Sequence, residues 1–235
     1  MVHFNRHDLV TISASARRKI YEELPACARN WPLKEVEQLA LCGYDGVFAP
    51  GIVRRQDDAP PGILQIGLSS PYRRDGTRLR MSAAIPAAEV LERLTPYQAA
   101  ELPPPACRRD DALYALLASV RALGKQTGVA CGVYGSLALE LATGLPYCHA
   151  GSDLDLIVRY EDPAALDAFY AQLCQLEAES NVHIDAELAL RNGYGVKLKE
   201  FFSDSHYVLA KGFTDVRSLE KAEAAAMNHT KYYSI

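Results

Sequence analysis

The sequence has no long run of apolar residues and no strong excess of basic charge. No stretch approaches the ~18 consecutive apolar residues that a membrane-spanning helix needs, so we expect no membrane segment. The first ten residues, MVHFNRHDLV, lack the apolar centre of a secretory signal, and we therefore expect a cytoplasmic protein. The net charge of −4 argues against a nucleic-acid-binding protein, which usually presents a basic surface.

The cysteines lack the spacing of a metal site or of a disulfide framework. No CxxC pair is present, and no cysteine has a His-x-His neighbour. Zinc sites and disulfide-stapled folds need closer or patterned cysteines. We therefore expect reduced cysteines, most of which pack as small apolar side chains: Cys27, Cys42, Cys107, Cys131, Cys148 and Cys174.

What is present is an ordinary globular composition with an uneven distribution of charge. Hydrophobic residues make up 49% of the 235 residues and charged residues 23%, which excludes a disordered chain, a collagen-like chain and a coiled-coil rod. Residues 1–85 contain 12 basic and 9 acidic residues, whereas residues 86–235 contain 13 and 20. We therefore predict two domains, residues 1–85 and 86–235, with different partners.

The amino-terminal part is predicted to be a small α+β domain. Short apolar runs between turn residues predict strands, and helical apolar spacing predicts two helices. The Asp75-Gly76 pair indicates a turn, and the proline-rich segment 102–106 breaks regular structure between the two domains. The predicted elements are strands at 9–13, 46–55, 62–68 and 79–85, and helices at 16–24 and 33–41.

The second part alternates helices and strands, which is typical of a mixed sheet flanked by helices. Pro163 is well placed in the first turn of a long helix. The predicted helices are 111–126, 136–143 and 163–180, and the predicted strands are 129–134, 154–158 and 182–188. The sequence thus predicts an α+β fold with a larger carboxy-terminal domain.

The segment 133–158 contains the residues that best indicate chemistry. On a strand, side chains two apart share a face, so Asp153 and Asp155 are predicted to point together while Leu154 and Leu156 enter the core. Two carboxylates on one face repel one another, so the Asp-x-Asp pattern on a strand indicates a functional pair rather than a chance occurrence. Paired carboxylates are suitable ligands for one or two Mg²⁺ ions, which can bridge phosphate oxygens and activate an attacking hydroxyl.

Gly135 and Ser136 provide the complementary part of this pattern. Glycine allows the backbone to approach a phosphate closely. Ser136 is predicted at the start of a helix, where backbone N–H groups, the helix dipole and its hydroxyl favour an anion. The order of strand, Gly-Ser, short helix and Asp-x-Asp strand therefore predicts a phosphate cradle next to a metal site.

This combination resembles the signature of the nucleotidyltransferase superfamily, over about residues 111–200. The resemblance implies a third carboxylate on a later strand, which helps to activate the nucleophile. Asp185 is the natural match, and Glu187, two residues on and on the same face, is a competing candidate. A solvated charge on the strand face is the alternative interpretation of Asp185.

More narrowly, the chain resembles the phosphoribosyl-dephospho-coenzyme A transferases, also called malonate decarboxylase holo-acyl-carrier-protein synthases. The likeness spans most of the chain and rests on Arg6-His7-Asp8-Leu9, Gly51-Ile52-Val53-Arg54-Arg55, Tyr134-Gly135-Ser136, Ser152-Asp153-Leu154-Asp155-Leu156 and Gly195-Val196-Lys197-Leu198-Lys199-Glu200. It implies that the 2'-(5''-phosphoribosyl)-3'-dephospho-coenzyme A group passes from its triphosphate precursor to a serine of the apo acyl carrier subunit of malonate decarboxylase, with release of pyrophosphate. It also implies that Asp153 and Asp155 are essential and act through Mg²⁺.

Basic residues in both parts are compatible with a polyanionic substrate. If 195–200 is extended, Lys197 and Lys199 share a face and can bind the pyrophosphate leaving group, with Lys211 and Arg217 as weaker candidates. Either the carrier or the precursor could be steered by the basic residues of the first domain. These are Arg54, Arg55, Arg73, Arg74, Arg78 and Arg80. For both groups, solvated surface charges are the alternative.

Two other functions remain as hypotheses. One is a small-molecule nucleotidyltransferase, such as one that adenylylates an antibiotic. The other is a non-catalytic nucleotidyltransferase-fold module that binds a partner in the manner of an antitoxin. Retention of Gly135, Ser136, Asp153 and Asp155 argues against the module, because a degenerate site has no need of them.

Overall fold

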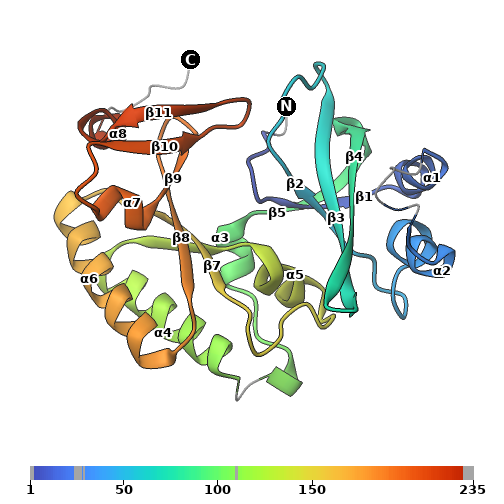
Figure 1. The fold of residues 1–235 in the computed structure, drawn as a ribbon, viewed down its shortest axis with the longest axis horizontal. Coiled ribbons are helices and arrows are strands. Elements are labelled where there is room, and N and C mark those ends of the chain that lie inside the picture. Colours follow the sequence, from blue (N-terminus) through green and yellow to red (C-terminus); the bar gives the residue numbers. More distant parts are fainter. Residues whose placement is uncertain (1–2, 24–27, 29, 109–110, 230–235) are drawn as a thin grey trace.

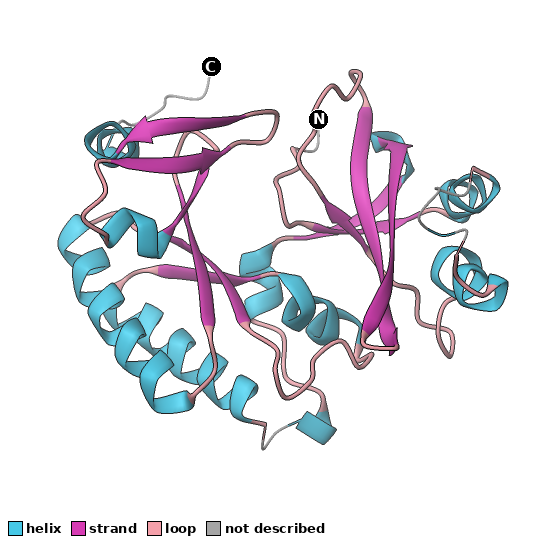
Figure 2. Cartoon of the chain, in the orientation of Figure 1, coloured by secondary structure: helices cyan, strands magenta, loops and turns pink. Residues whose placement is uncertain are grey.

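The computed structural model describes residues 3–23, 28, 30–108 and 111–229 (Figure 1). Helices lie along two outer sides of the molecule, and the strands of two sheets lie between them (Figure 2). Helices and the strands of two sheets follow one another along the chain, so the predicted α+β class is confirmed. Within the described residues, no helix is both long and apolar enough to cross a membrane.

The first sheet is antiparallel throughout and has the strand order β4-β3-β2-β1-β5. Its long hairpin turns at Asp75 and Gly76, whose φ angles of 50° and 76° belong to the left-handed region that a tight hairpin turn requires. The predicted turn is therefore confirmed. The strands are β1 (Leu9–Ile12), β2 (Gly51–Val53), β3 (Ile63–Arg74), β4 (Thr77–Pro86) and β5 (Val90–Leu94).

The strand predicted over residues 46–55 is wrong for most of its length. Asp45 and Gly46 both have positive φ angles, and an isolated bridge joins Tyr44 to Val47, so the chain turns there before β2 begins at Gly51. β5 was not predicted, because its exposed acidic and basic residues hide its alternation. β5 pairs with β1, so the first sheet occupies residues 9–94, and the division of the chain at residue 85 stays a prediction.

Two predicted helices of this part are present. Ser13 accepts a hydrogen bond from the Ala16 N–H at 3.0 Å and begins the first helix, while the predicted end, Leu24, lies outside the described residues. The second continues as a π-helical turn and ends at Gly43. The helical elements are α1 (Ala14–Glu22), α2 (Leu33–Glu37), η2 (Gln38–Cys42), η3 (Ala87–Glu89) and α3 (Pro96–Ala100).

The second sheet has the order β11-β10-β9-β8-β7-β6. β7 and β8 are parallel and the other neighbours are antiparallel, so the sheet is mixed, as predicted. Only the three strands that come first along the chain were predicted, because the rest are short or largely exposed. The strands are β6 (Ala130–Val133), β7 (Leu154–Arg159), β8 (Ile184–Ala189), β9 (Gly195–Lys197), β10 (Tyr207–Lys211) and β11 (Val216–Glu220).

The helices of this part begin and end at recognisable residues. Asp111 caps α4 and Gly128 ends it in the left-handed conformation, while Asp162 caps α6 just before Pro163. All three predicted helices are confirmed to within one residue. The full set is η4 (Ala106–Arg108), α4 (Ala112–Thr127), α5 (Gly135–Thr143), α6 (Pro163–Ser180), α7 (Leu198–Phe202) and α8 (Lys221–His229).

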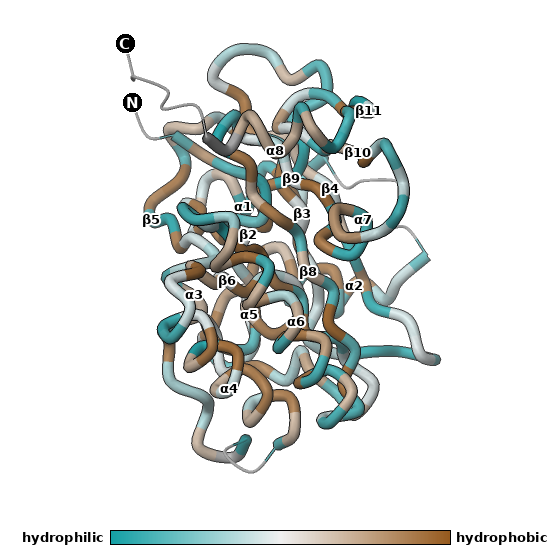
Figure 3. Tube along the Cα trace, turned by 90° about the vertical axis from the view of Figure 1, so that its left-hand side faces the viewer, coloured by the Kyte–Doolittle hydropathy of each residue, from teal (hydrophilic) through white to brown (hydrophobic). Residues whose placement is uncertain are grey.

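The two faces of the second sheet differ in character. Leu154, Leu156 and Val158 are fully buried, and they pair in register with Ile184, Ala186 and Leu188 of β8. α6 covers this face and packs against α4. Figure 3 shows hydrophobic stretches of chain along α4 and β6. Burial of one such side chain contributes roughly 1.5–3 kcal/mol. The alternate residues, which include Asp155 and Asp185, point to the opposite face.

The two sheets are joined by polar contacts between distant parts of the chain. The Gln56 N–H donates to the Phe213 carbonyl at 2.6 Å, and the Tyr147 hydroxyl donates to the Ser69 carbonyl at 3.0 Å. Cys42, Cys131, Cys148 and Cys174 are free, as expected, but Cys42 and Cys174 are exposed, so the expectation that most cysteines pack as small apolar side chains is wrong for these two. Cys27 and the side chain of Cys107 lie outside the described part.

Candidate active site

Asp155 is the centre of an acidic cluster on the open face of the second sheet. It lies in register with Asp185 on the parallel strand β8, and Asp153 is two residues before it at the exposed entrance to β7. Burial and the charges of Asp185 and Asp153 raise the pKa of Asp155 to about 7. The structure therefore brings together the three aspartates that the sequence singled out.

Gly135 lies directly against this cluster at the start of α5. Its φ angle is 67°, and a Cβ atom there would overlap the Asp155 carboxylate. The backbone N–H of Tyr134 donates to the Asp155 carbonyl at 3.1 Å, which fixes the turn from β6 into α5 to the metal-binding strand proposed from the sequence. The sequence predicted that the backbone at Gly135 lies close to a phosphate. In the structure it lies close to the Asp155 carboxylate.

The amino-terminal end of α5 has no side-chain cap. Tyr134 occupies the capping position, and tyrosine cannot replace the Ser, Thr, Asp or Asn that usually bonds these N–H groups. Ser136, in the first turn, receives a long hydrogen bond of 3.4 Å from Nη1 of Arg78 on β4. The predicted phosphate cradle and the predicted metal site therefore meet at this end of the helix and Asp155.

Asp185 and Glu187 share a face but have different partners. Lys197 on β9 forms an ion pair with both carboxylate oxygens of Asp185. Glu187 is 4% exposed and is held instead by Arg6, at 3.2 Å, and by His7, at 3.4 Å. In the register it lies opposite Ile157, one step further from the cluster, so the structure places Asp185 rather than Glu187 beside Asp155.

The expectation that Lys197 and Lys199 share one face is wrong. β9 ends at Lys197 and α7 begins at Leu198, so the alternation of an extended strand stops between them. Lys199 lies 3.1 Å from Glu177 of α6 and lines a small cavity beneath that helix, with Ile184 and Ala186. Lys199 is therefore on the helix-covered side of the sheet, and Lys197 on the acidic side.

The two weaker basic candidates are engaged in other contacts. The backbone carbonyl of Lys211 accepts a hydrogen bond from Arg6 at 2.7 Å. Arg217 pairs with Asp215 at 3.0 Å and its guanidinium lies 4.4 Å from the centre of the Tyr194 ring. Neither contact includes a residue of the Asp155 cluster.

The donor chemistry of the acidic cluster fits Mg²⁺. Among the described residues, no three His, Cys, Asp or Glu side chains are gathered closely enough to form a ready-made metal site. The donor set is nevertheless hard carboxylate oxygen, and the pKa of Asp155 is raised first by burial and next by the charges of Asp185 and Asp153, whose repulsion a divalent cation would relieve. Asp153 and Asp155 would hold the ion, and the ammonium of Lys197 already compensates Asp185.

Sequence reasoning did not place three residues at this site. It named Arg6 only within a family motif and Arg78 only among the basic residues of the first domain, whereas the structure brings Arg6, from the turn before β1, to Glu187, and Arg78, from β4, to Ser136. Glu140 is 1% exposed in α5, where it accepts hydrogen bonds from the Tyr114 hydroxyl at 3.0 Å and the Cys148 N–H at 2.6 Å. A lone charge among apolar residues of a helix, Leu139-Glu140-Leu141, was a signal that could have found it.

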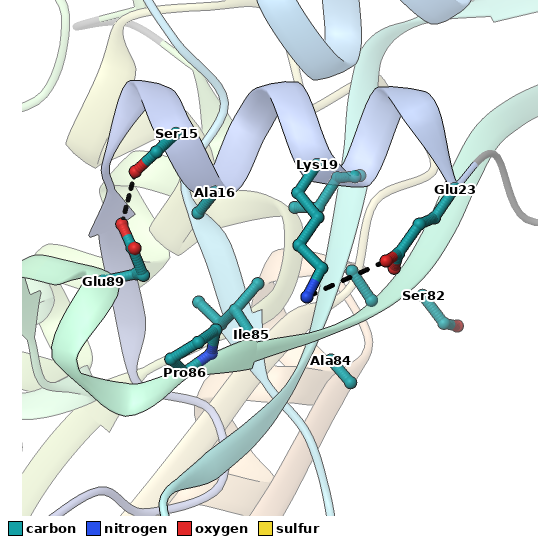
Figure 4. A pocket seen from close by; sticks show the side chains of 11 residues that line it. Ser15, Ala16, Lys19, Glu23, Ser82, Ala84, Ile85, Pro86 and Glu89 are labelled. Carbon is teal, nitrogen blue, oxygen red and sulfur yellow. Dashed lines mark hydrogen bonds and ion pairs between the residues drawn. The ribbon is translucent and has the colours of Figure 1, made fainter.

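A separate cavity of about 320 Å³ lies between α1 and β4 (Figure 4). Its polar residues are bonded to one another: Ser15 to Glu89 at 2.7 Å, and Lys19 to Glu23 at 3.8 Å. All residues that line it come from the first sheet and its helices, and none belongs to the acidic cluster. We therefore assign the candidate active site to the cluster around Asp155.

The chain matches known proteins over almost its whole length. Residues 5–96 match the family model "Phosphoribosyl-dephospho-CoA transferase MdcG N-terminal domain", and residues 98–222 match that of its C-terminal domain. The chain is 33% identical over 191 residues to the phosphoribosyl-dephospho-CoA transferase of Xanthomonas campestris pv. campestris (strain 8004), which covers 80% of this chain and 86% of that protein.

A second relative covers more of the chain. The phosphoribosyl-dephospho-CoA transferase of Pseudomonas aeruginosa is 34% identical over 206 residues, or 88% of this chain and 87% of that protein. No solved structure matches significantly. The two matched family models follow one another along almost the whole chain, as the two sheets do. The chain therefore belongs to the phosphoribosyl-dephospho-CoA transferase family and is a transferase.

Proposed function

We propose that this transferase attaches the 2'-(5''-phosphoribosyl)-3'-dephospho-coenzyme A prosthetic group to the acyl carrier subunit of malonate decarboxylase. The donor is triphosphoribosyl-dephospho-coenzyme A, and the acceptor is a serine of the apo carrier. Family membership supports the transfer of this group. The observation that carries the proposal is the contact of Gly135, at the uncapped start of α5, with Asp155, which in turn lies in register with Asp185.

In the proposed reaction, the serine oxygen forms a bond to the innermost phosphorus of the triphosphate. The bond from that phosphorus to the bridging oxygen breaks, and pyrophosphate leaves with the electron pair. Asp185 accepts the serine proton, and the neighbouring Lys197 ammonium stabilises the charge of the groups around it. Mg²⁺, held by Asp153 and Asp155, would supply charge neutralisation for the phosphate oxygens.

The other site residues bind and orient the substrate. Ser136 and the first N–H groups of α5 would donate to phosphate oxygens, which the positive end of the helix also attracts. Gly135 keeps the backbone close to Asp155, so the phosphate-binding turn and the carboxylates are held at a fixed separation. Such positioning contributes much of the rate in phosphoryl transfer, where the protein does little covalent chemistry.

The test is to load the carrier and weigh it. The protein is incubated with Mg²⁺, the triphosphoribosyl precursor and the apo carrier subunit, and the carrier mass is measured. We expect a covalent gain equal to the prosthetic group, released pyrophosphate, and loss of both with Asp153→Asn. Asp167→Asn, which changes an exposed aspartate on α6, is the matched control and should load normally.

Two outcomes would overturn the proposal. No mass gain, together with transfer from ATP to a small hydroxyl compound, would identify a small-molecule nucleotidyltransferase. Neither activity, together with stoichiometric binding of a partner, would identify a non-catalytic module.

A further inference from the structure

Arg78 is a buried cation that crosses from the first sheet to the candidate active site. It lies on β4 and only 8% of its surface is exposed. Its Nη1 lies 3.4 Å from the Ser136 hydroxyl, and its Nη2 donates to the Tyr147 carbonyl. The guanidinium is therefore placed at the first turn of α5, next to the Gly135–Asp155 contact.

Arg78 has no counter-anion in the part of the chain that the structure describes. Its hydrogen-bond acceptors there are a hydroxyl and a carbonyl, and its buried Nε has no hydrogen-bond partner. Burial, and next the charge of Arg73, lower the pKa of Arg78. The guanidinium also lies 5.5 Å from the centre of the Tyr147 ring, but neither this ring nor its two neutral acceptors carries a negative charge. A buried charge without a counter-charge is costly, so its retention calls for an anion that the described chain does not supply.

Two further features at the same place favour an anion. The nine-residue helix α5 begins there without a side-chain cap, so its first N–H groups and its dipole are available. Arg73 lies nearby, and its Nη2 is 2.6 Å from Nε2 of His149. His149 belongs to the segment that leads into Asp153. Among the described residues Arg73, like Arg78, forms no ion pair with a carboxylate.

We propose that Arg78 and the first turn of α5 form an anion subsite that binds the phosphoryl groups released as pyrophosphate. The first domain would thereby contribute a substrate-binding residue to the catalytic centre. A polyphosphate has the charge to compensate Arg78 and enough oxygens to accept hydrogen bonds from Nε and from the helix. The identity of the anion rests on the proposed function, whereas the existence of the subsite rests on the geometry.

The first experiment measures binding of the product alone. Magnesium pyrophosphate is titrated into the full-length protein by calorimetry. Arg78→Gln should raise the Kd at least tenfold, because a charge-assisted hydrogen-bond donor is lost, and Arg78→Lys should lie between. Arg18→Gln is the matched control, since Arg18 is an exposed arginine on α1 of the same domain and belongs to neither proposed site, and the Kd of this variant should stay within about twofold of the wild type.

A second experiment keeps the inference testable if Arg78 variants do not fold, which a thermal melt would reveal. A crystal of the wild-type protein with pyrophosphate should show phosphate oxygens on Arg78 Nε and at the first turn of α5. Equal pyrophosphate affinity in folded wild type and Arg78→Gln, or pyrophosphate bound elsewhere in the crystal, overturns the subsite.

Failure of the subsite can be told from failure of the proposed function. Carrier loading by the wild type together with unchanged pyrophosphate binding by Arg78→Gln removes the subsite and leaves the function. Pyrophosphate binding that depends on Arg78, without carrier loading, keeps the subsite and removes the proposed acceptor.

Discussion

Asp155 and Glu187 lie on neighbouring strands of one sheet face, yet they are held in opposite electrostatic states. Burial, Asp185 and Asp153 raise the pKa of Asp155 to about 7. Burial alone would raise the pKa of Glu187 too, but His7, Arg6 and Lys197 outweigh it and lower that pKa to about 2. His7 and Arg6 of the first domain, together with Lys197, compensate Glu187, whereas at Asp155 the charge of Lys197 does not outweigh burial and the neighbouring carboxylates.

The difference separates a structural contact from a reactive one. Around Glu187, Arg6 and His7 join the two domains, and His7 also stacks on Tyr134 with 4.0 Å between ring centres. Asp155 lies in a cluster with an excess of carboxylates, and at the neighbouring first turn of α5 Arg78 is buried without a counter-anion among the described residues. Charges balanced within the fold stabilise it, whereas unbalanced ones are available to a metal ion and a polyphosphate.

The largest expected effect is on catalysis by Asp155→Asn. Loss of the carboxylate should reduce carrier loading by about a thousandfold or more, since a metal-holding group is removed. The same change should raise the free energy of unfolding at pH 8 by roughly 1–3 kcal/mol, because it removes repulsion and a buried charge. Urea denaturation checks this, with Asp167→Asn as control, and a destabilised Asp155→Asn protein would show that the carboxylate is structural.

Gly135→Ala should reduce loading by about a hundredfold. The alanine methyl would overlap the Asp155 carboxylate and would have to adopt a φ angle of 67°, so either the aspartate or the turn must move. Gly193→Ala is a suitable control, because Gly193 also has a positive φ but no atom within 4 Å of the place that an alanine methyl would occupy. Initial loading rates measure the effect, and equal rates for both variants would contradict it.

Glu187→Gln should act on stability. Removing one partner of a buried ion pair leaves the Arg6 guanidinium with a weaker acceptor, at a cost of roughly 2–4 kcal/mol. Asp57→Asn, which disrupts the exposed Arg55–Asp57 pair, should lower the free energy of unfolding far less. Urea denaturation at pH 7 compares them, and similar costs for the two variants would remove the contrast between Glu187 and surface pairs.

The pH dependence should have opposite signs at the two carboxylates. The folded pKa of Glu187 is depressed, so its stabilising contribution is complete above pH 4.5 and is lost as pH falls towards 2. The folded pKa of Asp155 is raised, so its destabilising contribution grows as pH rises from 3.8 to about 7. The measurement is the free energy of unfolding without Mg²⁺ as a function of pH. The difference in this free energy between the wild type and Asp155→Asn should change across that window, whereas the difference between the wild type and Glu187→Gln should stay constant above pH 5.

The smallest expected effect is that of Lys199→Gln. Lys199 binds Glu177 on the covered side of the sheet, so its loss should change loading by less than about twofold. Lys197→Gln, in contrast, leaves Asp185 without its cation and should reduce loading about tenfold or more. A pyrophosphate inhibition assay of both variants checks the ranking, and equal losses would return Lys199 to the site.

Local pattern predicted the elements that carry the aspartates. The alternation Asp153-Leu154-Asp155-Leu156 specifies a strand with one acidic face, and Pro163 marks the start of a helix that the structure reproduces. The short strands β9, β10 and β11 could not be predicted, because β9 is only three residues long and the others are largely exposed. The hypothesis that residues 195–200 are all extended fails because β9 ends at Lys197 and α7 begins at Leu198.

By itself, the sequence determined the carboxylate pair, the glycine beside it and the family, because these depend on residues close together in the chain or on similarity along it. Only the tertiary structure decided between Asp185 and Glu187 as the neighbour of Asp155, since both share a face and the register places Asp185 opposite Asp155 and Glu187 opposite Ile157, where Arg6 reaches it. It also brought Arg78 to Ser136, which is 58 residues away in sequence. Such pairings follow from sheet register and domain packing, which local periodicity does not encode.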